Sequence, residues 1–188
     1  AIEIALACET PLRVAAKVDP ADGAYFEREI RPRLDHPLVE WVGEIDDGQK
    51  NGFIGNARAL LFPIDWPEPF GLVMIEALAC STPVIAYRCG SVAEVLEQGR
   101  TGFIVDSQEE AIAAARRVDT TARAACRLSF ESRFTAATMA RRYVEVYARL
   151  GQQTLAEMAG APCRTASRSA TSGTWRPPPR APRKIRRS

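Results

Sequence analysis

Five short apolar runs, each followed by a longer amphipathic stretch, constrain the fold of this chain more than any other feature. The runs are LRVAAK (12–17), LVEWVG (38–43), RALLFP (58–63), PVIAY (83–87) and GFIVD (102–106). Short runs with so little polar alternation are typical of strands buried on both faces. Strands that alternate with helices predict an α/β fold, in which helices flank a Rossmann-like parallel sheet. Such sheets bind ligands at the carboxyl ends of their strands.

Helices are expected between and after these strands. Asp22 begins one that is interrupted near Pro32, and residues 46–57 form a loosely helical linker whose glycines weaken the prediction. Ser91 and Gly99 bound a short helix as its cap and its stop. Further helices are expected over residues 71–80, 107–117, 120–134 and 135–150.

The charge distribution divides the chain near Leu150. The whole chain carries 25 basic and 23 acidic residues, but residues 151–188 hold eight of the basic residues and only one acidic residue. Residues 1–150 therefore have a net charge of −5, and residues 151–188 of +7. We predict a folded domain over 1–150 and a disordered Arg-, Pro- and Ser-rich tail over 151–188. The tail is either a phosphate-binding arm or a non-functional extension, and the acidic domain argues against nucleic acid as a partner.

Composition excludes several classes of protein. The single histidine, His36, cannot build a zinc cluster alone, and five cysteines without CxxC spacing indicate reduced thiols. No window reaches the ~18 apolar residues that a membrane span needs. The first eight residues include Glu3 and have no basic lead-in, so no secretion signal is evident. We expect a cytoplasmic protein, with peripheral membrane association as an alternative for a longer form.

The stretch WPEPFGLVMIEALACSTPVIA (66–86) places seven residues between two glutamates. Glu76 lies in a predicted helix that is apolar on every side, and burying an unpaired carboxylate there is costly. Its missing donors come either from the vicinal hydroxyls of a ligand or from an internal arginine or backbone amides. Glu68 lies just before the helix start, where Gly71 permits close approach and free amides suit a phosphate or sugar oxygen. The alternative for Glu68 is a solvated loop carboxylate.

The segment EPFGLVMIEALACSTPVIA resembles the E-x7-E signature of retaining glycosyltransferases of family 4, which have the two-domain B-type fold. The flanking segments VEWVGEI, ALLFPIDWPEPFG and CGSVAEVLEQGRTGFIVD follow in the order of that family. The resemblance covers about residues 1–150 and implies the C-terminal, donor-binding domain. It implies transfer of a sugar from a nucleotide diphosphate to an acceptor with retention of configuration, without a cofactor and in many members without a metal.

The resemblance also implies roles for individual residues. Glu68 corresponds to the first signature glutamate, a catalytic residue beside the donor sugar, and Glu76 to the second, which binds the ribose hydroxyls. Sugar hydroxyls and phosphate are expected at the backbone amides of Phe70, Gly71 and Leu72, and the base near Gly43 and Glu44.

Departures from the family pattern bear on activity. A loop of the form G-R-x-x-x-x-K-G, whose Arg and Lys hold the diphosphate, is expected ahead of Ala1. The first and central strand of the sheet and an N-terminal, acceptor-binding domain are expected there too. Ser81 stands where the family usually has Gly. The alternative to the donor-binding half of an enzyme is therefore a non-catalytic fragment that binds a nucleotide sugar weakly or not at all.

Overall fold

The computed structural model describes residues 1–160, and side chains as far as residue 152. These residues fall into two compact units, Ala1–Glu145 and a second that starts at Val146. The last helix, α9 (Ala136–Gly160), contributes to both units and runs past the boundary predicted at residue 150. The remainder of the predicted basic tail, residues 161–188, lies outside the described residues.

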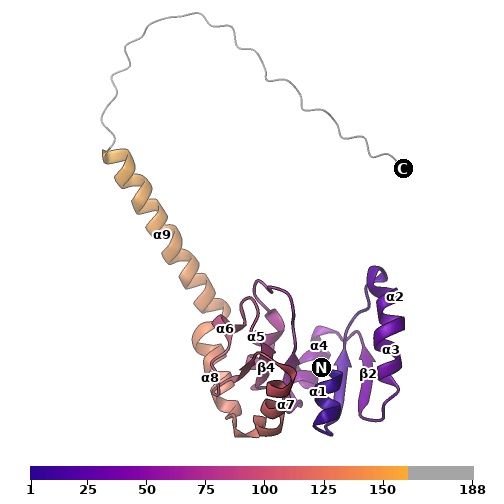
Figure 1. Ribbon diagram of the computed structural model, residues 1–188. Helices are drawn as coiled ribbons and strands as arrows, with labels where there is room; N and C mark the ends of the chain where they lie inside the picture. Colours follow the sequence, from indigo (N-terminus) through magenta and orange to yellow (C-terminus); the bar gives the residue numbers. More distant parts are fainter. Residues whose placement is uncertain (161–188) are drawn as a thin grey trace, which may run out of the picture. The chain divides into compact units, whose positions relative to one another are not determined.

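The first unit alternates strands and helices along the chain, as the apolar runs predict (Figure 1). The strands are β1 (Leu12–Ala15), β2 (Val39–Gly43), β3 (Leu60–Phe62), β4 (Val84–Tyr87) and β5 (Gly102–Val105). The α-helices other than α9 are α1 (Ile2–Ala7), α2 (Gly23–Tyr25), α3 (Arg31–Leu34), α4 (Asp47–Gly55), α5 (Leu72–Ala79), α6 (Val92–Val95), α7 (Gln108–Arg117) and α8 (Arg123–Arg133). A π-helical turn (Phe26–Ile30) joins α2 to α3, and short 3-10 turns span Pro20–Asp22 and Val118–Thr120.

All strand pairs are parallel, and they form two separate sheets. β1 pairs with β2, whereas β3, β4 and β5 form a three-stranded sheet in that order. The predicted α/β fold class, with parallel strands flanked by helices, is thus confirmed. Among the described residues, β1 and β3 each have a strand on one side only.

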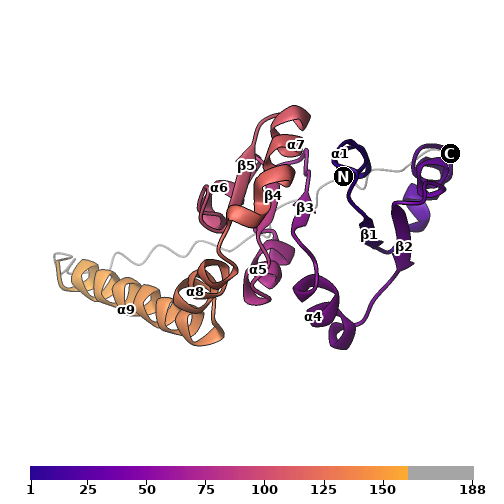
Figure 2. The ribbon, with the colours of Figure 1, turned by 90° about the horizontal axis from the view of Figure 1, so that it is seen from below.

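The three-stranded sheet is covered on both faces, which explains its short and continuous apolar strands. Figure 2 shows α1 and α7 on one side of the sheet and α4 and α5 on the other. Alternate residues of β4 divide between two apolar clusters: Ile85 packs with Ile4 of α1 and Ala111 of α7, and Val84 packs with Met74 of α5 and Ile54 of α4. This alternation is the period of two that a pleated strand imposes on its side chains.

Residues 46–57 form a better helix than their glycines predict. Asp46 caps α4 by accepting a hydrogen bond from the Gln49 N–H, and the Gln49 side chain accepts one from the Asp46 N–H. This reciprocal capping box satisfies two of the backbone donors at the helix start. The nine-residue helix that results places Lys50 on the wall of a cavity in the first unit.

Candidate functional site

Glu68 is held in a defined position by the loop that joins β3 to α5. Its carboxylate accepts hydrogen bonds from the backbone N–H of Gly71 (3.1 Å to Oε1) and from the indole Nε1 of Trp66 (3.2 Å to Oε2). Both contacts lie within the loop itself, and Glu68 remains partly exposed. An ionised carboxylate has about four lone-pair positions, so about two remain for a ligand.

A second loop, which follows β4, packs directly on the backbone of Glu68. Gly90 has a φ of +53°, and a Cβ atom there would overlap the Glu68 carbonyl oxygen and lie 2.5 Å from the Glu68 nitrogen. The neighbouring N–H of Ser91 donates to that carbonyl oxygen over 2.9 Å. Only glycine permits both this backbone conformation and this approach. The loops after β3 and β4 therefore position Glu68 together.

Gly71, the residue immediately before helix α5, has a φ of +68° and is buried. A side chain there would overlap the terminal methyl group of Met74. The Gly71 amide, predicted to bind a ligand, is engaged by Glu68 within the protein. Phe70 and Leu72 flank it with exposed side chains, so this end of α5 faces solvent.

Glu76 is neither fully buried nor unpaired. Its side chain is 38% exposed, and the Nζ of Lys50 lies 3.0 Å from its Oε1. The prediction of a solitary buried carboxylate is therefore wrong, because α4 places a cation beside α5. The internal cation that was the alternative explanation is present, as a lysine in place of the expected arginine.

Lys50 is a residue of this site that the sequence did not reveal. Its Nζ also lies 3.1 Å from Oδ1 of Asp47, one turn earlier in α4. Hydrogen bonds first to Glu76 and then to Asp47 raise the pKa of Lys50 above its ordinary value, so the amine is charged at neutral pH. The spacing of Asp47 and Lys50 is a visible signal of a helical pair, but the contact with Glu76 spans 26 positions and exists only in the folded chain.

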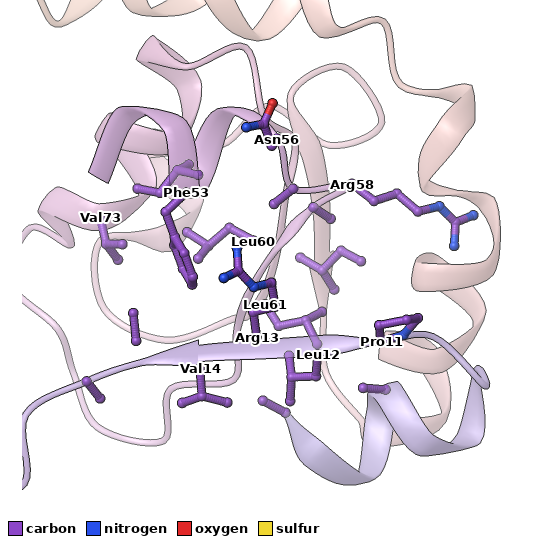
Figure 3. A pocket seen from close by; sticks show the side chains of 18 of the residues that line it. Pro11, Leu12, Arg13, Val14, Phe53, Asn56, Arg58, Leu60, Leu61 and Val73 are labelled. Carbon is purple, nitrogen blue, oxygen red and sulfur yellow. The ribbon is translucent and has the colours of Figure 1, made fainter. Parts of the chain in front are cut away.

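A cavity of about 680 Å³ lies inside the first unit (Figure 3). Of the residues predicted to bind the donor, Glu44 and Glu76 line this cavity, together with Lys50. The structure therefore divides the predicted residues into a group on the cavity and a group around the start of α5. The second group consists of Glu68, Phe70, Gly71 and Leu72. Gly43 is the last residue of β2, has a φ of +83°, and immediately precedes Glu44 of the first group.

Three further properties concern the described part of the chain. Residues 1–160 contain no group of three or more His, Cys, Asp or Glu side chains placed to hold a metal ion. No helix in this range combines the length and the apolar character needed to cross a bilayer. Cys8, Cys80, Cys89 and Cys126 are free thiols.

The sequence and the fold both match known glycosyltransferases. Residues 16–123 match the family model described as "Glycosyl transferases group 1". A D-inositol 3-phosphate glycosyltransferase of Arthrobacter sp. (strain FB24) is 42% identical over 60 residues, which are 32% of this chain and 14% of that protein. An uncharacterized 41.2 kDa protein in the cps region of Klebsiella pneumoniae is 29% identical over 126 residues, which are 63% of this chain and 35% of that protein.

Solved structures share the fold. Sucrose-phosphate synthase of Thermosynechococcus elongatus superimposes with a TM-score of 0.67 at 26% identity, over 81% of this chain and 42% of that chain. HepE of Anabaena, in a crystal structure with UDP and glucose, superimposes with a TM-score of 0.67 over 79% of this chain and 44% of that chain. Its identity of 21% shows the fold alone.

This chain spans less than half the length of each relative named above. The region matched by the family model nevertheless takes in more than half of the chain, and it contains β2 to β5 with Glu68 and Glu76. The chain therefore belongs to the group 1 glycosyl transferase family.

Proposed function

We propose that residues 1–150 are the donor-binding half of a family 4 glycosyltransferase that retains the configuration of the transferred sugar. The observation that carries this proposal is that Glu76 lines the cavity while Glu68 is held just ahead of α5, in a chain of the group 1 glycosyl transferase family. The related fold of HepE, crystallised with UDP and glucose, supports a nucleotide-diphosphate sugar as the donor.

In this proposal Glu76 binds the two ribose hydroxyls of the nucleotide. Its side chain is 38% exposed, and the contact with Lys50 uses Oε1. A diol therefore has access to the remaining lone pairs without the ion pair being broken. Lys50 limits the rotation of the carboxylate through this ion pair. Glu44, on the same cavity, lies where the base of the nucleotide is proposed to bind.

Glu68 is proposed to act beside the donor sugar. Its two protein donors, Trp66 and Gly71, fix the carboxylate and leave lone pairs for sugar hydroxyls. The exposed start of α5, at Phe70 and Leu72, directs the positive end of the helix dipole toward the diphosphate. Preorganised groups of this kind stabilise the charge that develops on the leaving diphosphate.

The proposed reaction exchanges one bond at the anomeric carbon for another. The bond from this carbon to the diphosphate oxygen breaks, and the diphosphate leaves with the electron pair. The oxygen of an acceptor hydroxyl bonds to the same face of the carbon and loses its proton. In this proposal no metal or resident cofactor takes part, a separate N-terminal domain binds the acceptor, and the enzyme acts in the cytoplasm.

Calorimetric titration with nucleoside diphosphates tests this assignment. Replacing Glu76 by Ala removes hydrogen bonds to a charged group, each about 1.5–3 kcal/mol, and we expect binding to weaken at least tenfold. Lys50 keeps Asp47 as a partner in this variant, so it is not left unpaired. Glu131→Ala, which removes an exposed partner of Arg127 on α8, is the matched control and should bind normally. Absence of binding to the unmodified chain, or full binding by Glu76→Ala, contradicts the proposal.

A further inference from the structure

Trp66 presents its ring to solvent beside Glu68. The residue is 58% exposed, and it belongs to neither of the two apolar clusters of buried residues. Its one polar group, the indole Nε1–H, donates to Oε2 of Glu68 over 3.2 Å. The polar end of this side chain is therefore used within the loop, and the faces of the ring remain for a ligand.

The loop holds this ring and the Glu68 carboxylate as one unit. The Glu68 N–H donates to the Trp66 carbonyl oxygen over 2.8 Å, which closes a three-residue turn centred on Pro67. Proline fixes the backbone φ that such a turn needs. Glu68 also accepts hydrogen bonds from the N–H groups of Gly71, at Oε1, and of Ser91, at its carbonyl oxygen. A ligand therefore meets an aromatic ring and a carboxylate that are already held in place.

Apolar surface continues along the same loop. Trp66, Phe70 and Leu72 are all exposed and all lie between residues 66 and 72. Exposed apolar side chains that gather in one place mark an interaction site more often than those scattered singly. This group surrounds, in sequence, the glutamate that is proposed to act on the sugar.

An aromatic face next to a carboxylate limits the class of ligand. The carboxylate repels a phosphate, and an apolar side chain would leave the remaining lone pairs of Glu68 unused. A pyranose ring suits both groups, since its C–H bonds form an apolar face and its hydroxyls donate hydrogen bonds from the edge. An organic cation is the other ligand that both groups attract. Membership of a glycosyl transferase family favours the pyranose.

We propose that Trp66 is a stacking platform for a pyranose ring, whose apolar face lies on the indole while its hydroxyls donate to Glu68. This inference rests on the proposed function, and it adds a ligand class and a residue to that site. The ring belongs either to the transferred sugar of the donor or to a sugar that serves as the acceptor. Both have the same chemistry, and titration separates them.

The indole N–H signals in a proton–nitrogen correlation spectrum of the full chain test this proposal. The chain has three tryptophans, and the Trp66 signal is the one that disappears in Trp66→Phe. We expect the methyl pyranosides of glucose, galactose or mannose to move the Trp66 signal along a saturating curve. Trp41, whose ring packs against Phe26 with 5.1 Å between the centroids, is the internal control and should not move. Sorbitol, a polyol without a ring face, and tetramethylammonium, a cation, should leave Trp66 unmoved.

Nucleotide sugars identify the source of the ring. UDP-glucose, UDP-galactose and GDP-mannose are each compared with the matching nucleoside diphosphate. A Trp66 signal that moves with the nucleotide sugar alone, and then no longer responds to the glycoside, assigns the platform to the donor. A response to the glycoside that persists beside a bound nucleotide sugar assigns it to the acceptor.

The same titrations separate this inference from the proposed function. If nucleoside diphosphates bind and no sugar moves Trp66, the platform is wrong and the donor-binding proposal stands. If glycosides move Trp66 and no diphosphate binds, the platform stands and the donor-binding proposal fails.

Variants separate stacking from hydrogen bonding, with the backbone signals of Glu68 and Gly71 as reporters of binding. Trp66→Ala loses the ring and should bind the sugar about fivefold more weakly, whereas Trp66→Phe loses only the N–H and should stay within about twofold. Tyr25→Ala, which removes a ring that is 56% exposed on α2, is the matched control and should bind normally. The proposal is overturned by an unmoved Trp66 signal with every sugar, by an equal response to sorbitol or tetramethylammonium, by full binding in Trp66→Ala, or by equal losses in Trp66→Phe and Trp66→Ala.

Discussion

Replacing Gly90 by Ala tests whether the loop after β4 positions Glu68. The added methyl group would overlap the Glu68 carbonyl oxygen and lie 2.5 Å from the Glu68 nitrogen. Both are backbone atoms, so the neighbour cannot yield as a flexible side chain would. The hydrogen bond from Ser91 to Glu68 must lengthen if the two loops separate.

Gly99→Ala supplies the matched control. Gly99 also has a positive φ, of +75°, but a Cβ atom there meets nothing within 4 Å. The left-handed conformation alone costs an L-residue about 1–2 kcal/mol, and this applies to both variants. Overpacking against fixed atoms adds about 1–3 kcal/mol, and this applies only to Gly90→Ala. We therefore expect a loss of about 1–2 kcal/mol for Gly99→Ala and about 2–5 kcal/mol for Gly90→Ala.

Urea denaturation, followed by far-UV circular dichroism, measures both losses. The free energies of unfolding are compared between variants that share the same slope of unfolding free energy against urea concentration. A changed slope would indicate a change in the surface exposed on unfolding. Equal destabilisation by the two substitutions would refute the reasoning, because the contact between Gly90 and Glu68 would then contribute nothing.

Two other predictions concern stability. Ser81 adopts a φ of +62°, and Ser81→Gly should stabilise the chain by about 0.5–1 kcal/mol in the same urea assay; a loss of stability would contradict this account of the turn. Hydrogen bonding to Ser129, and then the charges of Arg100 and Arg133, lower the pKa of Glu97. A carboxylate with a lowered pKa stabilises the fold above its unfolded-state pKa, and this contribution is lost as pH falls through the folded-state value. Glu97→Gln should therefore unfold more easily than the unmodified chain by about 1 kcal/mol at pH 7, and this difference should shrink as pH falls through the folded-state pKa of Glu97; a difference that does not change with pH contradicts this cause.

The strands and most helices could be predicted from the sequence because their signals are local. Each predicted apolar run contains one strand, and the predicted helices over 71–80, 107–117 and 120–134 correspond to α5, α7 and α8. α4 was underestimated because its glycines lower helix propensity, whereas Asp46 and Gln49 stabilise its start through side-chain contacts.

The candidate site was predictable in its positions but only partly in its contacts. Glu68 and Glu76 stand out in the sequence, but the partners that bind them come partly from elsewhere in the chain. Lys50 and Gly90 are 26 and 22 positions away from the glutamates that they contact, and no local pattern reveals such pairs. The assumption that Glu76 is unpaired failed for this reason, since an apolar helix indicates burial and says nothing about a cation on a neighbouring helix.

The central claim is that Glu76 binds the diol of a nucleotide, and a double-mutant cycle measures this contact directly. The cycle compares binding of a nucleoside diphosphate and of its 2′,3′-dideoxy form to the unmodified chain and to Glu76→Ala. We predict that loss of the diol weakens binding to the unmodified chain about tenfold or more, as expected for hydrogen bonds to a charged group, and leaves binding to Glu76→Ala unchanged. Equal weakening in both proteins would contradict the account, because the diol would then bind elsewhere.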